Sequence, residues 1–368
     1  MSEKIYDFAI VGAGMAGASL AAELAPHADV LVLEAENQPG YHATGRSAAF
    51  WDECYGGPDV VPLTLASGPF LKQHDLLAPR GALHIGRAED AAKIDNFLSE
   101  FGETGATIER LDRAQIEQKM SGLRGEWIYG VWEPACSDID VAGLHSLYLG
   151  QARKAGAKLI VRAEVKCADH GTGGWRVQTA DGQSFRAAKL LNAAGAWADQ
   201  MARIAGINPL GITPYRRTVV QLRTDPEPAS DQPLVLDISG GFYFKPSSGR
   251  LWLSPHDEEP SSPCDAAPEE LAVATVIDRL ENVVDWKVEG VDTKWAGLRS
   301  FAPDRLPVYG ADSANPDFFW FAGQGGFGIQ TAPAAARLAA QLLLGHDRDA
   351  MTRDLDASRY DPERFQGG

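Results

Sequence analysis

The sequence is poor in cysteine and holds no pair of cysteines spaced for metal or redox chemistry. Four cysteines occur among 368 residues, and none lies in a Cys-x-x-Cys arrangement. This pattern excludes the common zinc-finger and thiol-redox signatures, and a disulfide framework is rare in a chain of this size. We therefore expect free thiols, no metal site and a reducing, cytoplasmic environment. The residues are Cys54, Cys136, Cys167 and Cys264.

Basic residues are also scarce relative to acidic ones. Lysine and arginine number 34 against 50 aspartates and glutamates, which gives a formal net charge of −16. Nucleic-acid binding proteins normally present a basic face, and anionic membrane surfaces attract basic segments. We therefore expect no nucleic-acid partner and no attraction to an anionic membrane.

No apolar segment is long enough to predict an integral membrane segment. The uncharged stretch from 8 to 22 falls short of the roughly 20 residues that a spanning helix needs. It also contains three glycines, so it fits a strand, a turn and a helix better.

What the sequence does contain is an alternation of strand and helix patterns. Ile5–Val11 is an apolar run with β-branched residues, 14–24 is rich in alanine and leucine, and Val30–Leu33 is a second apolar run. This order predicts a parallel βαβ unit. The same alternation returns where the amphipathic segment Val141–Lys154 precedes the short apolar run Lys158–Val161.

The remaining patterns predict further helices and strands, with strands dominating from 213 to 302. Helices are expected near 62–74, 88–101, 112–120, 268–282 and 332–344, and strands at 82–86, 127–132, 176–179, 184–187, 189–191, 217–223, 233–237, 242–246, 251–254 and 318–322.

A chain of this length exceeds what one hydrophobic core usually serves, so we expect two domains. The first is a Rossmann-like α/β domain with a mainly parallel sheet, and the second is an inserted α+β domain built on a largely antiparallel sheet. Both are discontinuous: the first is expected to contain 1–49, 138–207 and 304–368, and the second 50–137 and 208–303.

A glycine motif lies between the first predicted strand and helix. Gly12, Gly14 and Gly17 form a complete G-x-G-x-x-G, and Glu34 ends the second predicted strand. The glycines permit a tight turn, close approach of a pyrophosphate and close helix packing, while the carboxylate can bind ribose hydroxyls. The helix N-terminus favours the negative diphosphate. The sequence therefore predicts one dinucleotide-binding site.

A second glycine-rich loop, 323–328, precedes the helix predicted near the C-terminus. A helix N-terminus there could stabilise negative charge on a reduced flavin ring. This loop favours FAD over a nicotinamide dinucleotide.

Several long motifs resemble the D-amino-acid oxidase-like group of FAD-dependent oxidoreductases, which includes glycine and sarcosine oxidases. Within that group the chain resembles bacterial D-arginine dehydrogenase and related D-amino-acid dehydrogenases. The resemblance covers nearly the whole chain and is carried by 10–17, 40–49, 191–197, 295–301 and 324–330.

The resemblance implies non-covalent FAD, because no cysteine occupies the C-terminal position at which sarcosine-oxidase-type relatives attach the flavin. The residues that it implies for FAD binding are Gly12, Gly14, Met15, Ala16, Glu34, Ala35, Thr44, Gly45, Arg46, Ser47, Ala48, Val165, Ala193, Ala194, Gly195, Trp197, Gly297, Arg299, Gly325, Gly326, Phe327, Gly328, Ile329 and Gln330.

The resemblance also implies a substrate site around Arg299, which would clamp the substrate carboxylate. A guanidinium binds a carboxylate through two parallel hydrogen bonds and so fixes its orientation. Arg217 or its neighbour Arg216 would assist it. The other implied contacts are Tyr243, Tyr55 on a mobile lid loop, Gly326 and Gln330.

Two positions depart from D-arginine dehydrogenase. Phe50 replaces an active-site histidine, and Ala82 replaces the carboxylate that would meet a cationic side chain. Loss of that anion predicts a neutral substrate side chain. We expect an apolar pocket made of Phe50, Trp51, Ala82, Phe242 and Phe327. His84, on the same predicted strand face as Ala82, could reach it.

The implied activity is oxidation of a D-amino acid to its imino acid by hydride transfer from Cα to flavin N5, followed by hydrolysis. The partner is a small amino-acid-like carboxylate, and either oxygen or a quinone is the electron acceptor. A 2-hydroxy acid or an N-methyl amino acid remains an alternative substrate. A non-catalytic flavin-binding subunit of a larger complex is a further alternative.

Overall fold

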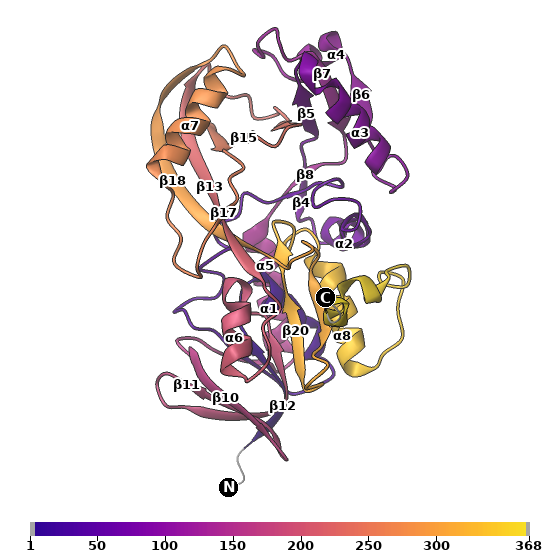
Figure 1. The fold of residues 1–368 in the computed structure, drawn as a ribbon, viewed down its shortest axis with the longest axis vertical. Coiled ribbons are helices and arrows are strands. Elements are labelled where there is room, and N and C mark those ends of the chain that lie inside the picture. Colours follow the sequence, from indigo (N-terminus) through magenta and orange to yellow (C-terminus); the bar gives the residue numbers. More distant parts are fainter. Residues whose placement is uncertain (1–3, 366–368) are drawn as a thin grey trace.

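The structure is a computed structural model that describes residues 4–365. The chain is elongated, with a mainly parallel sheet near the N-terminus and a large antiparallel sheet at the other end (Figure 1). Both sheets collect strands from distant parts of the sequence. The predicted fold class, a Rossmann-like α/β unit combined with a largely antiparallel sheet, is confirmed.

The first sheet is parallel at its centre. β1 lies between β12 and β2 and runs parallel to both, with Ile10 opposite Leu191 and Val32. The eight strands are β1 (Ile5–Val11), β2 (Val30–Leu33), β9 (Lys158–Ile160), β10 (Val165–Gly171), β11 (Gly174–Thr179), β12 (Ser184–Asn192), β19 (Val308–Ala311) and β20 (Phe318–Ala322).

Three helices cover one face of this sheet: α1 (Met15–Leu24), α5 (Val141–Lys154) and α8 (Ala332–Leu344). Small alanine-rich surfaces let them pack closely. α8 has Pro333 in its first turn and ends at Gly345, whose φ of +67° suits glycine. On the other face α6 (Ala198–Ile204) packs with buried aromatic residues, among them Trp175 and Trp320.

The second sheet contains ten strands and is antiparallel except where β14 meets β5. Its longest pair is β13 with β18, which run side by side along their lengths. The strands are β5 (Ala82–Gly86), β6 (Glu109–Leu111), β7 (Tyr129–Glu133), β13 (Thr213–Asp225), β14 (Leu234–Asp237), β15 (Tyr243–Ser247), β16 (Arg250–Ser254), β17 (Glu259–Pro260), β18 (Lys287–Phe301) and β21 (Gln324–Gly325).

The chain also forms a small third sheet and four further α-helices. The sheet contains β3 (Phe50–Trp51), β8 (Ser137–Ile139) and β4 (Leu77–Pro79). The helices are α2 (Val61–Gln73), α3 (Ala91–Phe101), α4 (Arg113–Lys119) and α7 (Glu270–Glu281). The Asp112 side chain accepts a hydrogen bond from the Gln115 amide at 2.9 Å and so caps α4.

The strand expectations need two kinds of correction. The segments 184–187 and 189–191 are one continuous strand, β12, because its first half pairs with β11 and its second half with β20. Nine strands were not predicted: β3, β4, β6, β8, β10, β17, β18, β19 and β21. The first half of β18 is largely exposed and mixes charged residues with valine and glycine, so its hydrophobic pattern is too weak to reveal a strand that pairs along its length with β13.

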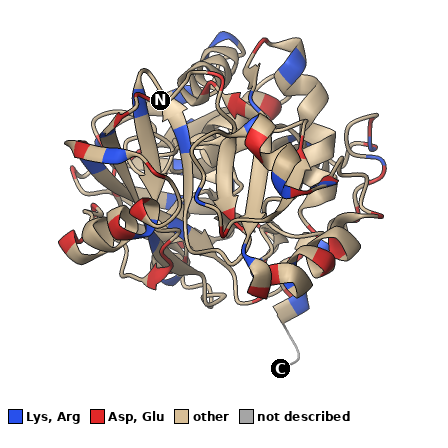
Figure 2. Ribbon diagram, turned by 90° about the horizontal axis from the view of Figure 1, so that it is seen from above, with Lys and Arg blue, Asp and Glu red and all other residues tan. Residues whose placement is uncertain are grey.

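The charged residues lie mostly around the outside of the molecule, with both signs interspersed (Figure 2). The central strands are largely free of them in the same view. Among residues 4–365 no helix is both long and apolar enough to cross a membrane.

The turn between β1 and α1 leaves no room for a side chain at Gly17. A Cβ there would lie 1.9 Å from the carbonyl oxygen of Gly12. We expect Gly17→Ala to lower the free energy of unfolding by about 3 kcal/mol and to reduce bound flavin, as measured by thermal unfolding and by visible absorbance.

Gly150→Ala is the control, because that glycine lies inside α5 with nothing within 4 Å of the added atom. It should stabilise the protein by about 0.5–1 kcal/mol. Equal losses in both variants would contradict the steric argument.

Candidate active site

The glycine turn after β1 is fixed by side chains from two other segments. The Glu34 carboxylate accepts hydrogen bonds from the amides of Ala13 at 2.8 Å and Glu36 at 2.9 Å. The Thr44 hydroxyl accepts one from the Met15 amide at 2.9 Å. The turn and the 40–47 segment are therefore held together at the N-terminus of α1.

A cavity of about 500 Å³ runs from this turn to β18 and the 324–329 segment; we call it the long cavity. The structure brings most of the predicted FAD-binding residues to its walls. They are Gly12, Gly14, Met15, Ala16, Glu34, Ala35, Thr44, Arg46, Ser47, Val165, Ala193, Ala194, Gly195, Trp197, Gly297, Arg299, Gly325, Gly326, Gly328 and Ile329.

Four predicted residues do not line the long cavity. Ala48 and Gln330 line a neighbouring, smaller cavity. Gly45 supports the loop, since its amide donates to the Gly40 carbonyl at 2.8 Å, and Phe327 packs its ring against Tyr55. Sequence reasoning also missed several wall residues outside the motifs: Glu36, Gln200, Met201, Ile204, Cys264 and Ala266. His42, Leu298 and Ser300 also line the wall and lie within the motifs 40–49 and 295–301.

Arg46 connects the loop at 265–266 to the wall of the long cavity. Its guanidinium donates to the carbonyls of Ala266 at 2.9 Å and Ala296 at 3.2 Å, and pairs with Asp265. The Trp295 indole in turn donates to the Arg46 carbonyl at 3.0 Å. The guanidinium therefore positions protein elements, while the residue still contributes to the cavity wall.

The smaller cavity, about 20 Å³, adjoins the long one; we call it the small cavity. Ser47, Arg299, Gly326 and Ile329 line both. Its walls are Ser47, Ala48, Ala49, Phe50, Tyr55, Leu236, Tyr243, His256, Arg299, Gly326, Ile329 and Gln330.

Gly326 lies where the two cavities meet. A Cβ there would lie 2.0 Å from the Tyr55 hydroxyl and 3.1 Å from Cδ of Arg299. Glycine at this position lets the backbone approach both side chains closely. This close approach brings Tyr55 and Arg299 to one edge of the small cavity.

Arg299 is a buried cation without a partner of opposite charge. It is 8% exposed, and its Nε has no hydrogen-bond partner within residues 4–365. In the part of the chain that the structure describes, no acidic side chain forms an ion pair with it. An unpaired buried charge is costly, so the small cavity favours an anionic ligand group at this guanidinium.

The strand register decides between the two neighbouring arginines of β13. Tyr215 lies opposite Arg299, and Arg217 lies opposite Gly297, so Arg217 shares the sheet face of Arg299 and Arg216 occupies the other face. Arg217 is nevertheless neutralised, because it donates to Glu258 at 3.1 Å and to the Asp257 carbonyl at 2.9 Å.

Gln330 contacts the protein with every polar atom of its carboxamide. The amide nitrogen donates to the carbonyls of Asp52 and Tyr55 and to the Thr64 hydroxyl, at 2.9–3.2 Å. The oxygen accepts from the Asp52 amide at 3.1 Å. Gln330 therefore fixes the segment that carries Tyr55 to the start of α8.

His256 is a wall residue that sequence reasoning missed, since no motif surrounds it. It lies in a left-handed conformation with φ of +56° and packs edge-on against the Tyr243 ring. Burial, together with the charges of Arg217 and Arg299, lowers its pKa to about 3. His256 is therefore neutral at physiological pH and adds no third positive charge.

The predicted apolar pocket needs correction. Phe50 lines the small cavity and Ala82 packs with it, but Trp51 points away and donates to the Thr64 carbonyl at 3.1 Å. Phe242 lies in the antiparallel-sheet core against Trp127. The reason is strand geometry, because neighbouring residues on a strand face opposite sides.

Two further pocket expectations also differ from the structure. Phe327 does not line the small cavity itself; it packs behind Tyr55 and against Phe301. His84 does not reach the small cavity and is buried with Asp52 and Glu133.

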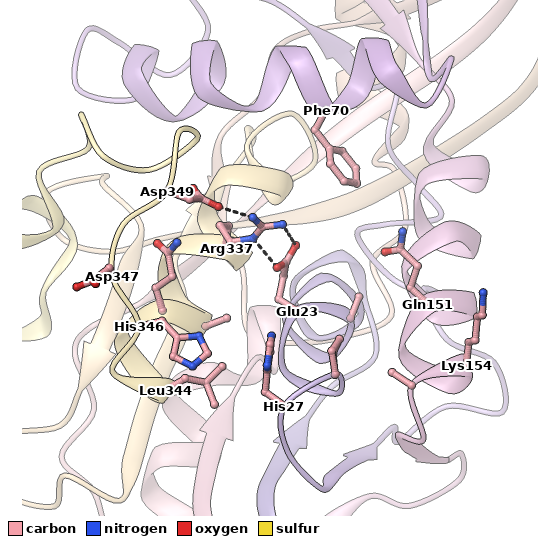
Figure 3. Close-up of a pocket in the computed structure, with 15 residues that line it drawn as sticks. Glu23, His27, Phe70, Gln151, Lys154, Arg337, Leu344, His346, Asp347 and Asp349 are labelled. Carbon is pink, nitrogen blue, oxygen red and sulfur yellow. Dashed lines mark hydrogen bonds and ion pairs between the residues drawn. The ribbon is translucent and has the colours of Figure 1, made fainter.

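A larger cavity of about 690 Å³ lies away from both glycine motifs, among α1, α5 and α8 (Figure 3). Arg337 in its wall lies between Glu23 and Asp349 and forms an ion pair with each of them. Of the described side chains that line it, none has a buried polar atom without a partner. It therefore gives no chemical reason to bind a specific ligand.

The fold and the two joined cavities define a dinucleotide-dependent oxidoreductase. The chain matches the DAO family, described as FAD dependent oxidoreductase, over residues 7–342 and belongs to that family. The predicted family and the predicted cofactor, FAD, are thereby confirmed. The nearer resemblance to D-arginine dehydrogenase stays a prediction.

Curated relatives are distant. FAD-dependent oxidoreductase domain-containing protein 1 of Mus musculus is 24% identical over 403 residues, covering 92% of this chain and 82% of that protein. Glycine oxidase of Geobacillus kaustophilus is 24% identical over 356 residues, covering 92% and 93%. Mitochondrial dimethylglycine dehydrogenase of Homo sapiens is 25% identical over 395 residues, covering 95% of this chain and 44% of that protein.

A solved structure supports the fold. The crystal structure of glycine oxidase from Geobacillus kaustophilus superposes with a TM-score of 0.85 at 22% identity. The superposition covers 98% of this chain and 99% of that one.

The depressed pKa of His256 predicts a loss of stability in acid. The unfolded chain takes up a proton near pH 6.5, whereas the folded His256 does so only near pH 3, so stability falls as the pH drops below 6.5. Between pH 7.5 and 5, His256→Gln should lose about 2 kcal/mol less unfolding free energy than wild type. Urea unfolding at several pH values measures this, with His170→Gln on the exposed part of β10 as control. Parallel curves for wild type and His256→Gln would contradict it.

Proposed function

We propose that the protein oxidises the amine of a small D-α-amino acid with a neutral side chain to an imino acid, which water hydrolyses to the 2-oxo acid. The observation that carries this proposal is Arg299, the buried guanidinium of the small cavity that has no acidic partner within residues 4–365. A carboxylate matches both its charge and its two-pronged donor geometry.

The long cavity fits FAD. Glycines of both glycine-rich loops line it, and α1 begins at its wall, so the positive end of this helix is available to a diphosphate. Glu34 would hold the ribose, and the 324–329 segment would border the flavin ring. When bound, FAD supplies the acceptor for a hydride. We propose that it is held without a covalent bond.

Arg299 would bind the substrate carboxylate beside Gly326, at the junction of the two cavities. This arrangement orients the substrate Cα toward the long cavity, and such positioning is a major source of rate acceleration. The Tyr55 and Tyr243 side chains close the small cavity around the bound group. His256 stays neutral beside Arg299, so Arg299 is the unpaired positive charge that faces the carboxylate.

The walls support a neutral substrate side chain. Phe50, Leu236 and Tyr243 form an apolar cluster with Ala82, and the small cavity measures about 20 Å³. A charged side chain placed against these walls would lose its hydration without gaining a partner. The size also favours substrates with few side-chain atoms.

A second candidate is the oxidation of an N-methyl amino acid. It is supported by the similarity to dimethylglycine dehydrogenase and by the small size of the cavity. The carboxylate clamp serves either substrate equally. For either substrate we propose oxygen or a quinone as the electron acceptor. We propose a cytoplasmic location in both cases.

Removal of the clamp should disable substrate binding and orientation together. Arg299→Ala should lower kcat/KM about 10²–10³-fold, as expected when a buried charge pair loses one partner. Flavin absorbance should confirm that the cofactor is still bound. The control is Arg223→Ala, since Arg223 lies at the half-exposed far end of β13 and pairs with Asp292. A change below about threefold in Arg299→Ala would refute the clamp.

A substrate panel separates the candidates. We expect small neutral D-amino acids to give the highest kcat/KM, measured with oxygen and with a quinone or dye acceptor. L-amino acids, N-methyl amino acids and 2-hydroxy acids complete the panel. D-Arg or D-Lys as the best substrate would disprove the neutral pocket, while anaerobic flavin bleaching by none of the panel would favour a non-catalytic subunit.

A further inference from the structure

Three ionisable side chains lie buried together behind the wall of the small cavity. Asp52 follows β3, His84 belongs to β5 and Glu133 ends β7. Ala82 lies opposite Glu133 in the β5–β7 ladder, so Glu133 shares a sheet face with His84. The exposed fractions of Asp52, His84 and Glu133 are 1%, 7% and 0%.

Each of the three side chains presents an atom without a partner in residues 4–365. These atoms are Asp52 Oδ2, His84 Nε2 and Glu133 Oε2. One ligand atom from each of the three lies within 4.8 Å of the other two, and His84 Nε2 lies 3.9 Å from Glu133 Oε2. Three unsatisfied donors and acceptors at one buried point are unusual in a native protein.

The other carboxylate oxygens are already held by the backbone. The Cys54 amide donates to Asp52 Oδ1 at 2.9 Å, and the Glu53 amide donates to Glu133 Oε1. These bonds fix one oxygen of each carboxylate, and the two acid groups lie beside each other. The arrangement is therefore preset, because neither acid can rotate without losing a backbone hydrogen bond.

No cation of the protein balances the two acids. Among residues 4–365, no lysine or arginine forms an ion pair with Asp52 or Glu133. Two buried carboxylates without a counter-ion must take up protons or a metal cation.

We propose that Asp52, His84 and Glu133 form a binding site for one divalent transition-metal ion, with zinc as the favoured ion. Two carboxylate oxygens and one imidazole nitrogen are ligands that zinc accepts, and they supply three of the four ligands of its tetrahedral geometry. Zinc–ligand distances of about 2.0–2.2 Å place two ligands roughly 3.4 Å apart. The present separations therefore require small side-chain movements.

A bound ion would have a positioning role. Because the three side chains are buried and do not line the small cavity, the fourth coordination position would hold a water molecule and not the substrate. Asp52 is bonded through its backbone to Gln330, and Gln330 also holds the Tyr55 carbonyl. The ion would therefore lock the segment that places Tyr55 in the small cavity.

The test measures metal content of the FAD-loaded protein. Wild type and variants are produced in medium supplemented with Zn²⁺, Mn²⁺ and Fe²⁺, dialysed against metal-free buffer, and analysed by inductively coupled plasma mass spectrometry. We expect about one metal ion per chain in wild type and less than about 0.1 in Glu133→Gln and His84→Gln. His170→Gln, which removes an exposed histidine paired with Asp317, is the control and should retain the ion.

Two results would overturn the proposal: no bound metal in wild type, or an equal content in wild type and Glu133→Gln. Flavin absorbance and circular dichroism show whether the variants fold. If they do not, anomalous X-ray scattering from wild-type crystals decides the matter, with a peak among the three side chains expected. No peak there would leave the two acids neutralised by protons.

Discussion

The pairing of β13 with β18 is the interaction on which the site depends. It places Gly297 against the 43–46 segment at the long cavity, since a Cβ on Gly297 would lie 3.3 Å from that of Arg46. Two residues further on, the same strand presents Arg299 to the small cavity. One ladder therefore fixes the distance between the cofactor region and the carboxylate clamp. Loss of register by a single residue would turn Arg299 to the opposite face.

The two arginines on this face are both buried but differ in their partners. Arg217 is more buried than Arg299, yet the turn after β16 supplies it with Asp257 and Glu258. Arg299 receives no such partner in the described chain. The site thus contains two positive charges and only one that is available. An anion is drawn to the second arginine because the first is already satisfied.

The sequence predicts local features well and contacts across the fold poorly. The bounds of β2 and α5 agree with the predicted ones, because their apolar pattern and caps lie in neighbouring residues. His256 carries no local signal, and its role depends on Arg217 and Arg299 from other strands. The buried Asp52–His84–Glu133 cluster is assembled by pairing of β5 with β7, so spacing along the chain cannot reveal it. Trp51 was misplaced because a strand alternates its faces.

The four hydrogen bonds of Gln330 restrict how the Tyr55 segment can move. The carboxamide holds the backbone at Asp52 and Tyr55 and also donates to the Thr64 hydroxyl. Gly56 and Gly57 follow directly, with φ values of +105° and +87°, and a Cβ on Gly57 would meet no atom within 4 Å. The chain therefore leaves the anchored Tyr55 through two residues in the left-handed region, where a side chain at either position would strain the backbone.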